Sequence, residues 1–133
     1  MNRIFIDTSA FYALADKKDP AHRKARKFLE KINIPLVTTD FIFAETMSLI
    51  TKRLGKNIAI EFGKGIKESS IIDLMFLSVE YQNLAWDLFC SQEDKEWDFI
   101  DCTCFIAMEK IGIMTAFSLD RHFAQRGFAM APD

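Results

Sequence analysis

The chain of 133 residues has few of the residues that cross-link a small protein covalently. It contains only three cysteines, Cys90, Cys102 and Cys104, an odd number without C-x-x-C spacing. These positions exclude a scaffold in which every cysteine pairs, and they provide no cysteine-based zinc pattern. We therefore expect buried free thiols in the reducing environment of the cytoplasm.

Long apolar runs are also missing. No stretch approaches the roughly 18 residues needed to span a bilayer, so we expect no association with a membrane. Asp7 interrupts an N-terminal apolar segment that otherwise resembles a secretory signal, and this argues against export. A glycine-rich phosphate loop is absent too, because Gly63-Lys64-Gly65 lacks the P-loop spacing.

A strong charge of one sign is the third absence. The net charge of −2 excludes a polycation that wraps nucleic acid along its whole surface. Seven of the 17 basic residues nevertheless fall within residues 17–31. Arg23, Lys24 and Lys27 in this stretch are candidate contacts for RNA phosphates, and the alternative is an ordinary solvated helix face.

What is present is an ordinary globular composition, half apolar, with 13 phenylalanines that predict a dense aromatic core. The length suits one domain over residues 1–133. Apolar stretches predict strands over residues 3–6, 36–38, 71–77, 115–118 and 128–131, the last at a sheet edge. Periodicity predicts helices over residues 9–15, 21–32, 40–54, 57–68, 79–92, 99–110 and 121–125. We expect Asp40 and Ser78 to cap the starts of two of these helices and Gly112 to end a third. Strands that alternate with helices indicate a parallel sheet covered on both faces.

Two carboxylates are placed where such sheets bind ligands. Asp7 and Asp120 lie at or just beyond the carboxyl ends of predicted strands, the edge at which open parallel sheets bind their ligands. Taken alone, each is also explained as the N-cap of the helix that follows.

Glu45 lies within an otherwise apolar helical segment, Phe41-Ile-Phe-Ala-Glu-Thr-Met-Ser-Leu-Ile50. The helical neighbours of Glu45, which include Ala44 and Ser48, are apolar or small, so we expect this face to point toward protein. Burying an isolated carboxylate costs several kcal/mol unless a cation or hydrogen-bond donors compensate. A metal ion is the compensating group that we predict.

Asp98 and Asp101 share one face at the start of a predicted helix. Asp98 is well explained as the N-cap, whereas Asp101 lies one turn inside the helix and directly precedes an apolar stretch that begins with Cys102. Several acidic oxygens that converge on one point require a shared hard cation, and Mg²⁺ prefers oxygen ligands. We interpret His22 and His122 as surface or packing residues, since neither has a partner nucleophile.

Three segments together resemble a PIN domain. These are Ile4-Phe-Ile-Asp-Thr-Ser-Ala-Phe-Tyr-Ala-Leu14, Thr38-Thr-Asp-Phe-Ile-Phe-Ala-Glu-Thr-Met47, and Trp97-Asp-Phe-Ile-Asp-Cys-Thr-Cys-Phe-Ile-Ala-Met108 followed by Ile113-Met-Thr-Ala-Phe-Ser-Leu-Asp-Arg-His-Phe123. The resemblance, which extends to VapC-type toxins, implies a three-layer α/β/α sandwich with a mainly parallel sheet of four to five strands. It also implies a ribonuclease dependent on Mg²⁺ or Mn²⁺, with Asp7, Glu45, Asp101 and Asp120 as catalytic metal ligands.

The resemblance also suggests supporting roles and partners. It implies that the hydroxyl group of Thr8 or Ser9 supports the acidic site. Asp98 is a departure from the pattern, because the family often has Ser or Thr at this position. Small members of the family resemble the toxins of type II toxin–antitoxin pairs, which are homodimers inhibited by a protein antitoxin. Alternatives that stay open are a housekeeping RNA-processing nuclease and a non-catalytic RNA- or protein-binding module. A dehalogenase-type phosphatase is disfavoured because Ser9 stands where that class needs a second Asp.

Overall fold

A computed structural model describes residues 2–133. Within that range, five strands form one sheet in the order β3-β2-β1-β4-β5, and every neighbouring pair is parallel. The strands are β1 (Ile4–Ile6), β2 (Leu36–Thr39), β3 (Ile72–Met75), β4 (Thr115–Phe117) and β5 (Ala129–Ala131). The predicted parallel sheet is confirmed, including its C-terminal edge strand.

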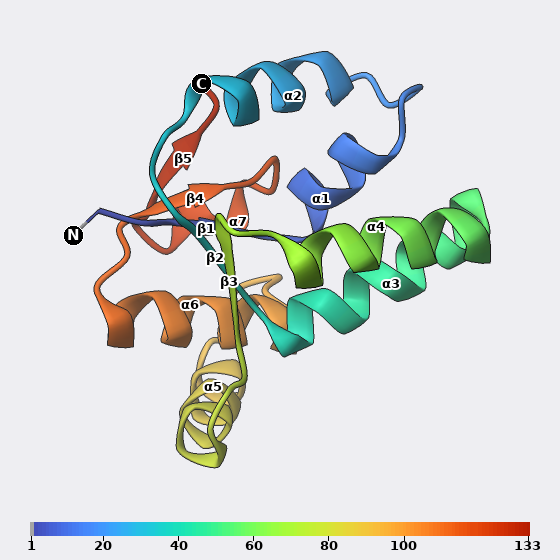
Figure 1. Cartoon of the computed structure of the whole chain (residues 1–133). Coiled ribbons are helices and arrows are strands. Elements are labelled where there is room, and N and C mark those ends of the chain that lie inside the picture. The colour runs from blue at the N-terminus through green and yellow to red at the C-terminus, as the bar shows by residue number, and fades with distance from the viewer. Residues whose placement is uncertain (1) are drawn as a thin grey trace.

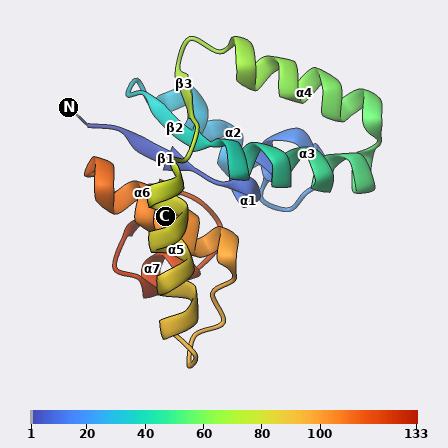
Figure 2. The ribbon, with the colours of Figure 1, turned by 90° about the horizontal axis from the view of Figure 1, so that it is seen from below.

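Helices connect the strands and form the two outer layers. They are α1 (Thr8–Ala15), α2 (His22–Lys31), α3 (Asp40–Leu54), α4 (Lys56–Glu68), α5 (Val79–Ser91), α6 (Phe99–Ile111) and α7 (His122–Gln125). Helices α1 and α2 lie on one side of the sheet and α5 and α6 on the other (Figure 1). Helices α3 and α4 pack together and extend beyond the sheet (Figure 2). The expected α/β/α sandwich is confirmed.

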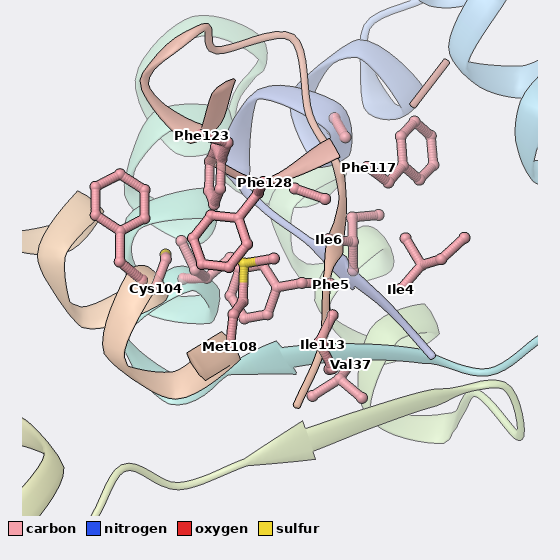
Figure 3. Close-up of a cluster of buried hydrophobic side chains, with 14 of the residues drawn as sticks. Ile4, Phe5, Ile6, Val37, Cys104, Met108, Ile113, Phe117, Phe123 and Phe128 are labelled. Carbon is pink, nitrogen blue, oxygen red and sulfur yellow. The ribbon is translucent and has the colours of Figure 1, made fainter. Parts of the chain in front are cut away.

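The core explains why such short strands are stable. All three residues of β1 are buried, because helices cover both faces of the sheet. Phe5 packs against Phe123, with ring centroids 6.2 Å apart, and Phe128 lies on the same side (Figure 3). Phe105 packs against both Phe123 and Phe128. The predicted aromatic core is therefore present, and it holds β1 in the centre of the sheet.

Most helix ends follow the predicted capping residues, with two exceptions, Asp40 and Asp120; the N-cap of α7 is Arg121 rather than Asp120. The Ser78 side chain caps α5, and Gly112 ends α6 in the left-handed conformation that favours glycine, with φ of 77°. Asp40 was predicted to cap α3 but lies inside the helix. Thr39 takes that role by accepting from Ile42 N at 3.1 Å, while Asp40 accepts from the backbone of Leu77 at 3.0 Å.

The cysteines follow the expectation in part. Cys102 and Cys104 are buried free thiols on α6. Cys90 is free but exposed, so the expectation of burial is wrong there; it lies near the end of α5, where only Ala85 is fully buried. None of the helices within residues 2–133 has the length and apolar character needed to cross a membrane.

Candidate active site

The site lies where the connections of the sheet change direction. From the central strand β1 the chain proceeds to β2 on one side, and β4 pairs with β1 on the other. Asp7 directly follows β1, and Asp120 follows β4 after Ser118 and Leu119. Ligands of open parallel sheets bind at such a switch point, beyond the carboxyl ends of the strands.

The structure brings all the expected acids to one pocket. The pocket has a volume of about 280 Å³ and is lined by the end of the β1–α1 connection, α1, α3, the start of α6, the segment after β4 and α7. Its lining residues are Asp7, Thr8, Ser9, Ile42, Glu45, Leu49, Asp98, Ile100, Asp101, Cys104, Asp120 and Phe123. Residues separated by more than 100 positions in the sequence thus share one small concavity.

Asp7 is the most deeply buried of these acids, with 5% of its surface exposed. Its Oδ1 accepts from Ser9 Oγ at 2.8 Å and from the Ala10 backbone N–H at 3.2 Å, and its Oδ2 accepts from Ser118 Oγ at 2.8 Å. Burial raises its pKa to about 7 although these hydrogen bonds oppose the rise. Asp7 therefore caps α1, which confirms the N-cap interpretation, and it also lines the pocket.

Glu45 is fixed by a hydroxyl group rather than by a cationic side chain. Thr8 Oγ1 donates to Glu45 Oε1, and Thr46 Oγ1 lies 3.4 Å from Thr8 Oγ1. Within residues 2–133, Glu45 forms no ion pair with Lys or Arg. Burial raises its pKa, assisted by the negative charges of Asp98 and Asp120.

The expectation that the whole Glu45 face of α3 points toward protein is wrong. Glu45 is half-buried, and its neighbours Ala44 and Ser48 are exposed. Helix α3 directs Ile42, Thr46 and Ile50 into the protein instead. Glu45 lies at the border between these two faces, where one of its sides borders the acidic pocket.

Asp98 and Asp101 form a reciprocal capping box at the start of α6. Asp98 Oδ1 accepts from the Asp101 backbone N–H at 2.8 Å, and Asp101 Oδ2 accepts from the Asp98 backbone N–H at 3.1 Å. Burial, with a contribution from the charge of Asp98, raises the pKa of Asp101 to about 6. Asp98 caps the helix as predicted and also lines the pocket.

His122 is a site residue that the sequence analysis misplaced on the surface or in the packing. Its Nδ1 lies 2.7 Å from Asp101 Oδ2 and 3.4 Å from Asp120 Oδ1. Burial lowers the pKa of His122, but the hydrogen bond to Asp101 and the surrounding carboxylates outweigh burial and raise it. The signal available in the sequence was the spacing, two residues after a candidate ligand at the start of a helix.

The basic stretch lies apart from this pocket. Arg23, Lys24 and Lys27 are exposed on α2, and none of them lines the acidic pocket. Arg23 and Lys27 line a separate surface concavity with His22, Arg26 and Glu30. The RNA contact expected of this stretch stays a prediction.

Comparison with known proteins identifies the family. The family model described as the PIN domain matches residues 4–129. The chain belongs to the PIN-domain family. Over 125 residues it is 28% identical to the 23S rRNA-specific endonuclease VapC20 of Mycobacterium tuberculosis, a match that covers 94% of this chain and 95% of that protein.

Solved structures agree with this assignment. The crystal structure of Mycobacterium tuberculosis VapC20, described as a sarcin-ricin loop cleaving toxin, matches with a TM-score of 0.90 at 27% identity, covering 95% of this chain and 96% of that one. A DNA-bound VapBC from Salmonella typhimurium matches with a TM-score of 0.70 at 11% identity over 98% and 97% of the two chains. VapBC2 from Rickettsia felis, bound to a promoter fragment, gives 0.68 at 12% identity over 96% of each chain, and these last two show the fold alone.

The donors of this PIN-domain pocket fit a hard divalent cation. Asp101, Asp120 and His122 offer one ligand atom each within 4.8 Å of one another. Asp7 and Glu45, two of the four predicted ligands, lie outside this group of three but line the same pocket, and their pKa values are raised. An oxygen-rich set of this kind suits Mg²⁺ or Mn²⁺ better than the soft metals that favour thiolates. Cys104 also lines the pocket, but burial raises the pKa of its thiol well above the usual range and keeps it neutral.

Ser118 is a second residue that the sequence analysis missed. Its hydroxyl donates to Asp7, and it accepts from the Asp120 backbone N–H at 2.9 Å. Ser118 therefore connects the acid that follows β1 to the acid that follows β4. A buried serine at the end of an apolar strand, just before a candidate ligand, is the pattern that points to it.

Proposed function

We propose that this PIN-domain protein is a ribonuclease that hydrolyses RNA phosphodiester bonds with the help of Mg²⁺ or Mn²⁺. One observation carries the proposal: five carboxylates from four separate parts of the chain line a single pocket, and no Lys or Arg within residues 2–133 forms an ion pair with them. Hydroxyl and backbone donors and the single imidazole of His122 compensate only part of this negative charge, so the convergence of the acids favours a bound divalent cation. The similarity to an endonuclease supports RNA as the substrate.

The residues assigned to the metal are Asp7, Glu45, Asp101 and Asp120. A divalent cation held there supplies polarisation of the scissile phosphate and charge neutralisation. The chain itself positions the ligands. Ser9 and Ser118 hydroxyls hold both oxygens of Asp7, and Thr8 holds one oxygen of Glu45. These fixed carboxylates set the location at which the phosphodiester binds.

We assign the protein to the toxin half of a type II toxin–antitoxin pair that acts on RNA in the cytoplasm. The similarity to VapC20 supports this role, since that protein is described as a toxin and the match covers nearly all of both chains. The proposed partners are an RNA substrate and a protein antitoxin. Growth arrest on induced expression in a bacterial host, relieved by co-expressing the adjacent gene of the native locus, is the expected result. A housekeeping nuclease would give no relief.

We also propose that the chain forms a homodimer. Large apolar side chains are exposed on α5 and on the segment before it, namely Phe76 at 75%, Val79 at 72% and Trp86 at 55%. Val79 and Trp86 are seven residues apart on α5 and so lie on one face of the helix, and exposed apolar faces mark protein–protein interfaces. Light scattering coupled to size-exclusion chromatography should give twice the chain mass, and Trp86→Glu with Val79→Glu should give the monomer.

The nuclease proposal is tested by cleavage of single-stranded RNA with Mn²⁺. Asp7→Asn and Asp101→Asn should each abolish cleavage, whereas Asp94→Asn, an exposed acid outside the pocket, should leave cleavage unchanged. Equal cleavage by all four proteins would indicate a contaminating nuclease or another site. RNA binding without cleavage by the wild type would favour a non-catalytic binding module.

A further inference from the structure

His122 joins two of the candidate metal ligands. It is the first residue of α7, and its backbone N–H donates to Asp120 Oδ1 at 3.0 Å. Its ring nitrogen Nδ1 lies 2.7 Å from Asp101 Oδ2. One residue thus holds an acid of α6 beside an acid of the segment after β4.

The two hydrogen bonds to Asp101 fall on the same oxygen. Asp101 Oδ2 accepts from His122 Nδ1 and from the Asp98 backbone N–H, and no donor within residues 2–133 reaches Oδ1. Because a carboxylate oxygen accepts, this arrangement places the ring proton on Nδ1. The carboxylate is fixed through Oδ2, and its other oxygen stays free for a ligand.

Two of the other acids are fixed in the same way but by hydroxyl groups. Asp7 is held by Ser9 and Ser118, and Glu45 is held by Thr8. The only side chain that donates to Asp101 within the described chain is the imidazole of His122. Partners that orient metal-binding carboxylates contribute strongly to metal affinity, typically about 10- to 100-fold.

We propose that His122 is a positioning residue of the metal site, which donates Nδ1–H to Asp101 Oδ2 and so leaves Asp101 Oδ1 free to bind the ion. This inference rests on the proposed metal-dependent function. A direct ligand role is the competing assignment, because the ring lies within reach of the same ion. Imidazole ligands favour transition metals over Mg²⁺, so the two assignments differ in metal preference.

The test is calorimetric titration of Mg²⁺ and of Mn²⁺ into the full-length protein without RNA. His122→Asn keeps an N–H near the position of Nδ1, whereas His122→Gln places its N–H farther along, near the position of Nε2. We expect His122→Asn to stay within about threefold of the wild type for both ions. His122→Gln and His122→Ala should bind both ions about 10- to 100-fold more weakly.

The second histidine supplies a matched control. His22 contacts the Ala13 carbonyl through Nδ1 at 2.8 Å, away from the acids, so His22→Ala should leave both affinities unchanged. A thermal melt in EDTA identifies any variant that fails to fold, and the Asn-to-Gln comparison then decides the outcome without His122→Ala.

Three results would overturn the positioning role. Unchanged affinities in His122→Gln would show that the ring does not act on the site. Loss of Mn²⁺ affinity alone would identify a direct ligand, as would equal losses in His122→Asn and His122→Gln. A wild-type protein that binds neither ion would instead refute the proposed metal-dependent function itself.

Discussion

Replacing Asp7 with Asn separates the structural role of this residue from its functional role. The amide keeps the shape of the side chain and its ability to cap α1, since Asn caps a helix about as well as Asp. It removes the charge that the buried site disfavours. The substitution should therefore abolish metal-dependent cleavage and, in metal-free buffer, stabilise the fold.

The size of the stabilisation follows from the pKa of Asp7. Burial raises this pKa from 3.8 to about 7 in the folded state. Between these two values the folded protein binds a proton that the unfolded chain does not, so stability falls as the pH rises through this range. Above pH 7 the charged carboxylate costs roughly 4 kcal/mol, at 1.36 kcal/mol for each pKa unit.

The measurable gain is smaller than this limit, because the amide loses part of the hydrogen bonding from Ser9 and Ser118. We expect Asp7→Asn to raise the free energy of unfolding by about 1–3 kcal/mol at pH 8 and to change it little near pH 4. For a chain of this length, that gain corresponds to a Tm increase of about 4–12 °C.

The assay is urea denaturation in EDTA from pH 4 to pH 8, for the wild type and Asp7→Asn. Asp19→Asn is the matched control, because Asp19 also accepts a backbone N–H near a helix start, from Ala21 at 2.9 Å, but lies outside the pocket. A stability difference that does not vary with pH would refute the raised pKa. A loss of stability at pH 8 would show that the lost hydrogen bonding outweighs the relief of buried charge.

Two further predictions address the second acid and the basic helix. Thr8→Val removes the hydroxyl that holds Glu45 and lowers its pKa, so cleavage at limiting Mn²⁺ should be slower than in the wild type, and the loss should be larger at low pH than at high pH; equal rates at every pH would contradict this. Replacing Arg23, Lys24 and Lys27 with Gln should reduce the slope of log affinity for single-stranded RNA against log salt by about two, if each contacts one phosphate. An unchanged slope would indicate that α2 presents an ordinary solvated face and does not contact RNA phosphates.

The positions of the acids could be predicted because the relevant rules are local or topological. A carboxylate that directly follows an apolar strand lies at the carboxyl edge of a parallel sheet, and this located Asp7 and Asp120 near each other. The Ser78 and Gly112 helix ends followed from capping preferences in the same way. The parallel sheet itself followed from strands that alternate with helices.

Features set by tertiary contacts could not be predicted. The spacing places His122 near Asp120, but the contact of its ring with Asp101 spans 21 positions of sequence and depends on how α6 and α7 pack. Asp40 is a good capping residue, but Thr39 took the cap, and the Asp40 carboxylate accepts from the backbone of Leu77. The mixed exposure of α3 around Glu45 depends on which neighbours cover the helix.

The hydrogen bonds around the pocket explain how an acidic cluster is compatible with a stable fold. Within residues 2–133, every buried side-chain polar atom has a hydrogen-bond partner. Asp7 and Asp101 each satisfy a helix terminus as well as facing the pocket, so their charges offset part of their burial cost through capping and the helix dipole. Replacing either acid with a residue that cannot cap therefore removes two contributions to the free energy of unfolding: the stabilising contribution of the cap and the destabilising contribution of the buried charge. A change in stability alone cannot assign its role, whereas the pH dependence of that change can, because capping by Asn does not titrate and a buried carboxylate does.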